Sequence, residues 1–263
     1  MIFQASTIGE IAQEILEHRQ TFYVHSIFKK GFNIVNGDQT IIFIGSDENG
    51  AFPFGITVDH QTRSQLLANI SLNQQIRVTA NSLFINDGCQ LVWRNQPVHT
   101  SSVESEIDLA LLIGNITTYN FSEYDQGDFP YLKMQQIINV LKKDDKAEVE
   151  QSLRYLIGRG QGLTPSGDDI LTGTLFVHFM NPFILDQNLE IIRQLIKEPL
   201  TTLVATTFLK SALKGLFSSK ILVLQHKPTV YHMNKLLEVG SSSGKDTLYG
   251  IFVASTLRSG TYE

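Results

Sequence analysis

The chain has 263 residues, 42% of them hydrophobic and 18% charged, which is a globular composition and excludes a largely disordered protein. Its formal net charge of −5 gives no overall attraction for nucleic acid or anionic lipid, so we expect neither as a partner. A single cysteine, Cys89, excludes an intrachain disulfide and a multi-thiolate zinc site. With no signal peptide and no run of ~20 apolar residues, we expect a cytoplasmic protein without a membrane span.

The first hundred residues predict short strands after one short helix. Thr7-Ile-Gly-Glu10 is typical of a capping box that opens an amphipathic helix. Turn sequences containing Asn-Gly or Asp-Gly separate several of the segments that follow. Strands are predicted at 21–24, 32–35, 40–44, 56–58, 75–79, 82–85 and 90–93. Short strands with closely spaced turns predict a small antiparallel barrel or sandwich.

After residue 100 the hydrophobic pattern takes helical spacing. Helices are predicted at 103–119, 131–142, 146–157, 168–180, 188–198, 201–217, 230–239 and 245–258. Residues 119–130 are the best candidate for a loop. The sequence therefore predicts an α+β protein, with a β-rich domain over residues 1–100 and a helical domain over 101–263.

The most unusual segment is Gly158-Arg-Gly-Gln-Gly-Leu-Thr-Pro-Ser-Gly-Asp-Asp169. Glycine at every second position indicates unusual backbone dihedral angles or the close approach of a ligand. Residues 170–180 are apolar on nearly every side, as in a buried helix. The start of that helix would present free N–H groups and a partial positive charge, which predicts an anion cradle. The segment is neither a Walker A loop nor a dinucleotide fingerprint.

Part of this segment recurs later in the chain. Ser166-Gly-Asp-Asp-Ile-Leu-Thr-Gly173 and Ser243-Gly-Lys-Asp-Thr-Leu-Tyr-Gly250 share Ser, Gly, Asp, Leu and Gly at five of eight positions. The second glycine of each lies on the same helix face as the aspartate and costs ~1 kcal/mol relative to alanine. Close approach of another backbone or a ligand would justify that cost. We therefore expect two helix starts packed around a pseudo-twofold axis and opening on one pocket.

The two helix starts supply the candidate catalytic residues Asp168, Asp169 and Asp246. These aspartates are also the only candidates for a metal site, which would hold Mg²⁺; no other cofactor is indicated. Adjacent residues on a helix point about 100° apart, so Asp168 and Asp169 would not chelate a metal as a simple pair. A metal would need Asp246 or ligand oxygens to complete its coordination.

The candidate ligand-binding residues lie mostly in the same two segments. They are Gly158, Gly160, Gly162, Thr164, Ser166, Gly167, Ser243, Gly244, Lys245 and His25. Lys245 is a cation in a first helical turn, which a ligand anion, or Asp168 or Asp169 across a cleft, would compensate. Its ammonium could equally extend into water. His25 is predicted at a strand end, where it could face the cleft or be structural.

A purely structural interpretation stands beside the functional one. Ser-x-x-Asp is a capping-box variant, so Ser166 with Asp169 and Ser243 with Asp246 could simply cap helices. The Thr7 capping box has no glycine run, no adjacent second acid and no buried helix behind it. These surplus features of the later segment favour a site.

The long motif resembles the signature of bacterial proteins related to AllH, a family long described as a domain of unknown function. His25-Ser-Ile-Phe28 and Gly240-x-x-Ser-Gly-x-Asp246 are similar to that family's other common segments, and the resemblance spans roughly residues 20–258. It implies a link to oxamate carbamoyltransferase of anaerobic allantoin degradation. There an AllH-type protein is thought to act with two larger partner subunits, and a carbamoyl group moves between carbamoyl phosphate and oxamate.

Three hypotheses follow from the motif and the resemblance. The first is a subunit of a carbamoyltransferase complex, in which helix starts with Ser and Thr hydroxyls hold a small anionic substrate and a developing oxyanion. The chain lacks the Ser-x-Arg-Thr-Arg motif of ordinary transcarbamoylases, so it could be a non-catalytic subunit. The second is a stand-alone phosphotransferase or hydrolase that uses the three aspartates with Mg²⁺. The third is a regulatory or assembly module.

Overall fold

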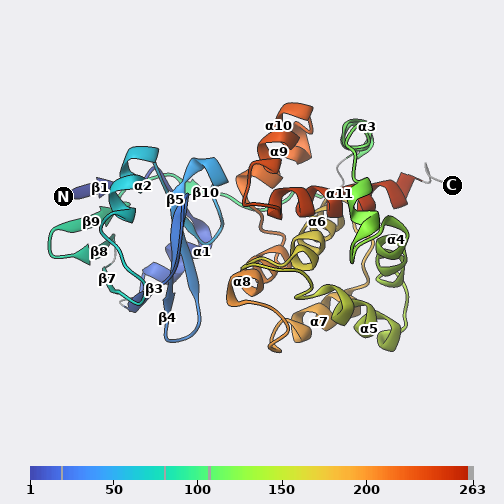
Figure 1. Cartoon of the computed structure of the whole chain (residues 1–263), viewed down its shortest axis with the longest axis horizontal. Coiled ribbons are helices and arrows are strands. Elements are labelled where there is room, and N and C mark those ends of the chain that lie inside the picture. The colour runs from blue at the N-terminus through green and yellow to red at the C-terminus, as the bar shows by residue number, and fades with distance from the viewer. Residues whose placement is uncertain (19, 80, 106–107, 260–263) are drawn as a thin grey trace. The chain divides into compact units, whose positions relative to one another are not determined.

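Backbone contacts divide the chain into two compact units. The N-terminal unit is Met1–Ser101 with Ser218–Lys220, and the C-terminal unit is Ser102–Phe217 with Ile221–Glu263. The first is built on a β-sheet and the second on helices, which confirms the predicted α+β class (Figure 1). The computed structural model describes residues 1–18, 20–79, 81–105 and 108–259.

Within the described residues, one sheet forms the N-terminal unit, with strand order β1-β9-β8-β7-β3-β4-β5-β6-β2-β10. Its strands are β1 (Ile2–Gln4), β2 (Thr7–Gly9), β3 (Thr21–Phe28), β4 (Gly31–Asn36), β5 (Ile41–Ser46), β6 (Gly55–Val58), β7 (Gln75–Thr79), β8 (Ser82–Asn86), β9 (Cys89–Val92) and β10 (Val98–His99). Most neighbours are antiparallel as predicted, but β1 with β9, β2 with β10 and β5 with β6 are parallel. The strands that the sequence did not predict are β1, β2 and β10, which are only two or three residues long.

Side-chain alternation explains why the predicted strands form. On β7, Ile76 and Val78 are buried while Gln75 and Arg77 are exposed, so this strand covers the core with one face. On β5 every residue is buried, as expected for a strand covered on both faces. Helices α1 (Glu10–Leu16) and α2 (His60–Leu67) bury Ala12, Leu16 and Leu66 in the same core.

The predicted capping box at Thr7 is wrong. Thr7 and Ile8 pair with Thr57 and Ile56 as strand β2, so their backbone is extended where the helix was expected to begin. Helix α1 begins only at Glu10, and Gly9 precedes it without a side-chain cap. Pairing along the sheet therefore determines this segment more strongly than its local capping pattern.

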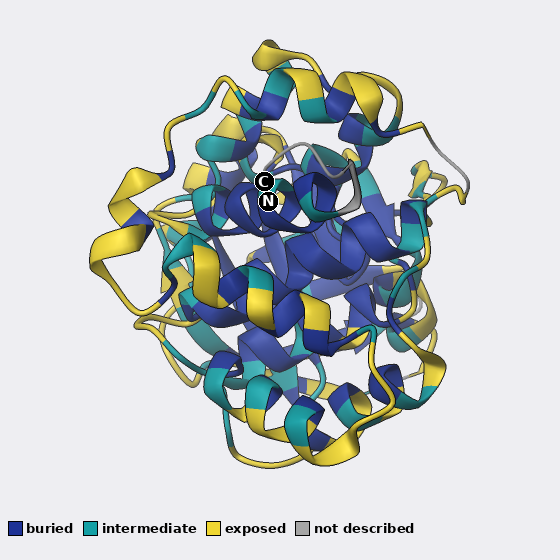
Figure 2. Ribbon diagram, turned by 90° about the vertical axis from the view of Figure 1, so that its right-hand side faces the viewer, coloured by how far each residue is buried: buried dark blue, intermediate teal, exposed yellow. Residues whose placement is uncertain are grey.

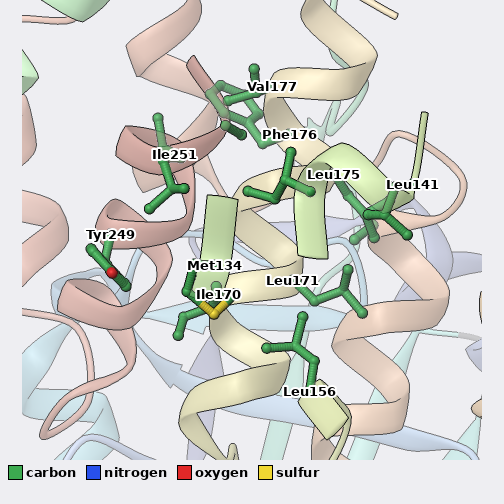
Figure 3. Packing of buried hydrophobic residues seen from close by; sticks show 14 of the residues in the cluster. Met134, Leu141, Leu156, Ile170, Leu171, Leu175, Phe176, Val177, Tyr249 and Ile251 are labelled. Atoms are coloured by element: carbon green, nitrogen blue, oxygen red, sulfur yellow. The ribbon is translucent and has the colours of Figure 1, made fainter. Parts of the chain in front are cut away.

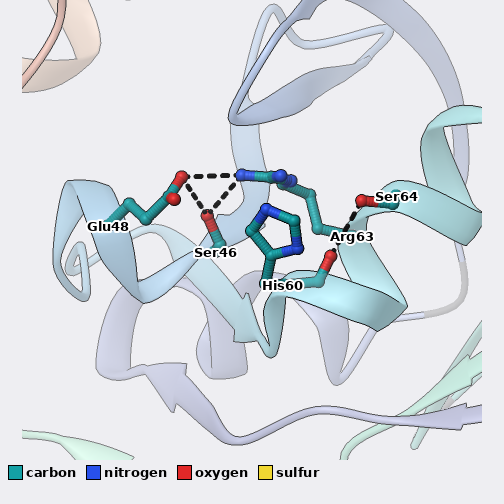
Figure 4. A network of polar contacts seen from close by, with 5 residues as sticks. All are labelled: Ser46, Glu48, His60, Arg63 and Ser64. Atoms are coloured by element: carbon teal, nitrogen blue, oxygen red, sulfur yellow. Dashed lines mark hydrogen bonds and ion pairs between the residues drawn. The ribbon is translucent and has the colours of Figure 1, made fainter.

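A polar network joins α2 to the end of β5. Arg63 is buried, and its Nη1 atom donates to Glu48 Oε2 at 2.6 Å and to Ser46 Oγ at 3.2 Å (Figure 4). The Ser46 hydroxyl also donates to Glu48 Oε2, at 3.2 Å. Since Glu48 neutralises the buried guanidinium within the chain, this network fixes α2 against the sheet.

The C-terminal unit is built from helices joined by loops, with an isolated antiparallel bridge between Ser102 and Leu216. Its elements are α3 (Ala110–Ile116), the 3-10 helix η2 (Ser122–Gln126), α4 (Tyr131–Val140), α5 (Lys146–Leu156), α6 (Ser166–Met180), α7 (Asp186–Leu195), α8 (Leu203–Ala212), α9 (Ser219–His226), α10 (Val230–Leu237) and α11 (Ser243–Ser259). The predicted helix over 103–119 is confirmed only for its C-terminal half. The sequence did not predict α2 or α9. Within the described ranges, no helix is both long and apolar enough to cross a membrane.

Helices α6 and α11 form the centre of this unit. Almost every residue of α6 is buried, which confirms the prediction of an all-round apolar, buried helix. Ile170, Leu171 and Phe176 of α6 belong to the same core cluster as Tyr249 and Ile251 of α11 (Figure 3). Buried ribbons fill the middle of the unit in Figure 2, and the exposed positions lie on its outer helices and loops.

Candidate functional site

The two repeated helices cross each other through their shared glycines. A Cβ atom added to Gly173 would lie 2.1 Å from the carbonyl oxygen of Thr247, and one added to Gly250 would lie 2.1 Å from that of Ile170. The same 77-residue offset relates Gly173 to Gly250 and Ile170 to Thr247. Such a reciprocal contact is what a twofold axis produces. The prediction that these glycines permit close backbone approach in a pseudo-twofold arrangement is confirmed.

The repeat extends to the helix that precedes each start. A Cβ atom on Gly167 would lie 1.9 Å from the carbonyl oxygen of Leu156, at the end of α5. A Cβ atom on Gly244 would lie 1.8 Å from that of Leu236, near the end of α10. The repeated unit is therefore a pair of helices, α5 with α6 and α10 with α11. The internal repeat found in the sequence covers only the start of the second helix of each pair, α6 and α11. Packing alone requires glycine at both positions.

The glycine-rich loop adopts the predicted unusual dihedral angles. Gly158, Gly160 and Gly162 have φ values of 76°, 120° and 86°. The N–H group of Gly158 donates to Asp168 Oδ1, and that of Gly167 donates to the carbonyl oxygen of Arg159. These two groups are thus engaged within the chain, and residues 160–163 between them are exposed.

A hydroxyl pair links the two helix starts. Thr164 Oγ1 lies 2.7 Å from Ser243 Oγ, and both residues are partly exposed. Ser166 does not act as a cap, because α6 is preceded by Pro165 and has no side-chain cap bond. The capping-box interpretation of Ser166 is therefore wrong. The N–H groups of Asp168 and Asp169 bond instead to the carbonyl oxygen of Pro165.

Asp169 and Asp246 occupy equivalent positions in the repeat and are buried, with exposed fractions of 7% and 3%. Asp169 accepts hydrogen bonds from Ser243, on the opposite helix start, and from Thr164. Asp246 Oδ1 accepts the Tyr124 hydroxyl at 2.7 Å. The Oδ2 atom of each aspartate is buried without a hydrogen-bond partner. Each start thus contributes one buried acceptor atom from the same position of the repeat.

Burial raises the pKa of Asp169 well above its usual range. The hydrogen bonds from Ser243 and Thr164 oppose this shift, while the charges of Asp246 and Asp168 add to it. Asp169 therefore binds a proton more readily than an exposed aspartate does. Asp169 is thus a titratable group with a shifted pKa inside the repeat.

Asp168 has a different environment, although it is adjacent in sequence. Its Oδ1 atom accepts the Gly158 N–H at 3.0 Å and its Oδ2 atom accepts the Thr201 hydroxyl at 2.5 Å. Burial raises its pKa, and these two hydrogen bonds oppose the shift. With both oxygens engaged, Asp168 fixes the glycine-rich loop beside Thr201, and these contacts support a positioning role. Its catalytic role stays a prediction.

A Mg²⁺ ion at the aspartates would need ligand or water oxygens in addition to carboxylates. No three acidic, His or Cys side chains of the described chain lie together as potential metal ligands. Both oxygens of Asp168 are directed to Gly158 and Thr201, as described above. The structure thus gives the Mg²⁺ hypothesis no ligand set made by the chain alone.

Lys245 is compensated by a residue that the sequence analysis missed. Its Nζ atom lies 2.5 Å from Glu123 Oε1, an ion-pair partner that differs from the expected Asp168 or Asp169. A ligand-binding role for Lys245 stays a prediction. Glu123 and Tyr124 both belong to η2, inside the segment predicted as a loop. The run Tyr119-Asn-Phe-Ser-Glu-Tyr124 was a signal, since aromatic residues are uncommon in solvated loops.

His25 belongs to the N-terminal unit. It lies within β3, where the pairing with β4 shifts between Val24 and Ser26, and not at the strand end. Its Nδ1 atom is 3.1 Å from Ser26 Oγ, which also accepts from Asn33 Nδ2 at 3.0 Å. A ligand-binding role for His25 stays a prediction.

A separate groove of about 420 Å³ lies between α4 and α5. Its lysines are already engaged: Lys143 pairs with Glu148, and Lys133 lies 5.0 Å from the centre of the Tyr155 ring. None of the predicted site residues lines this groove. The ligand-binding role of the paired helix starts stays a prediction.

Comparison with known families gives matches to both parts of the chain. Residues 4–98 match a model described as the AllH family N-terminal domain. Residues 156–255 match a model described as oxamate carbamoyltransferase subunit AllH. The second match contains both helix starts and both buried aspartates. No solved structure matches the chain.

Proposed function

Because the chain belongs to the AllH family, we propose that it is a subunit of an oxamate carbamoyltransferase-like complex. The complex would move a carbamoyl group between carbamoyl phosphate and oxamate or a related small acid. This chain would bind a small anionic ligand at the paired starts of α6 and α11. The observation that carries the proposal is the Thr164–Ser243 hydroxyl pair, which joins the two starts at 2.7 Å.

The chemistry of helix starts supports this role. The first N–H groups of a helix and its partial positive charge favour a phosphate or carboxylate group. Thr164, Ser166 and Ser243 are partly exposed and add hydroxyls that donate to ligand oxygens. Residues 160–163 are exposed in front of them. A ligand there would meet donors from both halves of the repeat.

The subunit description in the family name supports a multi-subunit enzyme. We propose two larger partner subunits in the cytoplasm, which would supply the groups that complete the carbamoyl-transfer site. This fits the absence from the sequence of the phosphate motif of ordinary transcarbamoylases. Asp169 and Asp246 are the proposed contribution of this chain to the reacting groups.

Reconstitution with the partner subunits tests the proposal. Phosphate release from carbamoyl phosphate, measured with oxamate present, should require this chain. Thr164→Val and Ser243→Ala should each lower the rate about ten-fold, because ~1.4 kcal/mol of lost interaction gives that factor. Ser64→Ala, on an exposed face of α2, is the control and should leave the rate unchanged. Turnover by the partners without this chain would contradict the proposal.

A further inference from the structure

We propose that Asp169 and Asp246 recognise the –NH2 group of a small primary amide, whose two N–H donors bond to the unpartnered Oδ2 atoms. The inference rests on the proposed function and names the part of the ligand that these residues bind. Oxamate and carbamoyl phosphate both carry such an amide. The two aspartates would then distinguish these molecules from anions of the same shape that lack N–H donors.

The first support is that both acceptor atoms are buried and unsatisfied. Buried polar atoms are nearly always hydrogen-bonded, and a buried charged group without a donor is costly. In the described part of the chain, Asp169 Oδ2 and Asp246 Oδ2 are the buried carboxylate oxygens that lack a donor. Both aspartates occupy the same position of the repeat, so the repeated helix start leaves two acceptor atoms without donors.

The second support is the set of contacts around the two carboxylates. Asp169, on α6, accepts from Ser243, on α11, so its side chain reaches across to the opposite start. The charge of Asp246 acts on Asp169. Asp246 is held by Tyr124 through its other oxygen, Oδ1. Asp246 is thus fixed through Oδ1, and both aspartates leave Oδ2 without a partner.

The third support is charge. Each helix start already has a carboxylate in its first turns, which partly offsets the positive end of the helix dipole. An anionic group has no N–H donors for these two acceptor atoms, and an ionised carboxylate would repel it. A primary amide fits this environment better, because it offers two donors to the carboxylates and one carbonyl acceptor. The Thr164 and Ser243 hydroxyls are the neighbouring donors for that carbonyl.

Two pairs of isosteric ligands test the inference by calorimetry on the full chain, alone and with its partner subunits. Oxamate and pyruvate differ only by –NH2 against –CH3, and so do carbamoyl phosphate and acetyl phosphate. We expect the amide member of a pair to bind at least ten-fold more tightly. Asp169→Asn and Asp246→Asn should reduce this preference at least ten-fold, because asparagine replaces an acceptor with a donor.

Asp168→Asn is the matched control. Its oxygens are engaged by Gly158 and Thr201, so the variant should leave the ratio between the two members of a pair unchanged, whatever it does to stability. Equal binding of amide and methyl ligands would overturn the inference while leaving the proposed anion site standing. A preference that survives in both asparagine variants would also overturn it. Binding of none of the four ligands, even with the partners present, would reject both the inference and the proposed function.

Discussion

The starts of α6 and α11 share residue types and backbone packing, but they differ in the side chains that contact them. Each has a serine, a glycine packed on the preceding helix, and a buried aspartate with one free oxygen. Gly167 follows Leu156 by eleven residues, whereas Gly244 follows Leu236 by eight. The longer connection contains the exposed glycine-rich loop.

The second start is braced by η2. Tyr124 donates to Asp246, and its ring stacks on Tyr249 with centroids 3.9 Å apart. Glu123, also in η2, forms an ion pair with Lys245, which precedes Asp246 in the first turn of α11. The corresponding aspartate of the first start, Asp169, is held by hydroxyls instead. The comparison shows how a repeated scaffold acquires two different environments from residues outside the repeat.

The largest expected effect comes from breaking the helix crossing. Gly173→Ala and Gly250→Ala should each lower the free energy of unfolding by about 3 kcal/mol or more, since the new methyl group would meet a backbone carbonyl that cannot move aside. Urea denaturation measures the change. Similar losses at both positions would support the pseudo-twofold relation, and a large loss at only one would contradict it.

Gly114→Ala is the control for these substitutions. Gly114 lies in α3, and nothing lies within 4 Å of a Cβ atom placed there. Alanine should therefore raise the free energy of unfolding by about 0.4–1 kcal/mol, through the reduced entropy of the unfolded chain.

Removing the brace on the second start should have the next largest effect. Tyr124→Phe keeps the ring stacking but leaves Asp246 without its hydroxyl donor, which should cost about 2 kcal/mol of unfolding free energy. Tyr119→Phe is the control, because the Tyr119 hydroxyl bonds to Asn234 at an exposed position. It should cost less than about 1 kcal/mol. Equal losses of unfolding free energy in the two variants would show that the buried Tyr124–Asp246 bond stabilises the chain no more than the exposed Tyr119–Asn234 bond.

Asp169 should give the first start its own pH dependence. Its pKa is raised in the folded chain, so the folded state retains a proton that the unfolded state has already lost. The free energy of unfolding should fall as the pH rises from the unfolded pKa of about 3.9 to the raised pKa, and should then level off. Asp169→Asn should remove this part of the pH profile of urea denaturation. A profile identical to that of the parent chain would contradict the assigned environment.

The sequence predicted those features that depend on local pattern or exact repetition. Alternating strands such as β7, the apolar helix α6 and the pairing of Gly173 with Gly250 all belong to this class. Helix α2 was missed because its sequence, His60-Gln-Thr-Arg-Ser-Gln-Leu-Leu67, has little apolar periodicity. Its stability comes from packing on the sheet and from the Asp59 cap, which accepts the N–H of Thr62.

The partners of the site residues could not be predicted, because they are distant in sequence. Tyr124 lies 122 residues before Asp246, and Thr201 lies 33 residues after Asp168. The loop containing Tyr124 was recognised, but its side chains had no periodicity that indicated their direction. Thr7 shows the opposite error, since a good local pattern was overridden by pairing with Thr57 in β6.

The smallest expected effect is at the Lys245–Glu123 pair. The two side chains are 38% and 57% exposed, so water and salt screen their attraction, and such pairs stabilise by no more than about 1 kcal/mol. Lys245 is also a cation in the first turn of α11, where the helix dipole disfavours positive charge by about 0.3–1 kcal/mol. The ion pair and the helix dipole oppose each other, so Lys245→Met should change the free energy of unfolding by less than about 0.5 kcal/mol.

Glu123→Gln should lower the free energy of unfolding more than Lys245→Met does, because it removes the ion pair and keeps the unfavourable cation. Urea denaturation of both variants and of the double variant, at low and high salt, separates the two terms. A loss above about 2 kcal/mol for Lys245→Met would mean that the pair supports the η2 brace itself, beyond what a screened surface contact can provide.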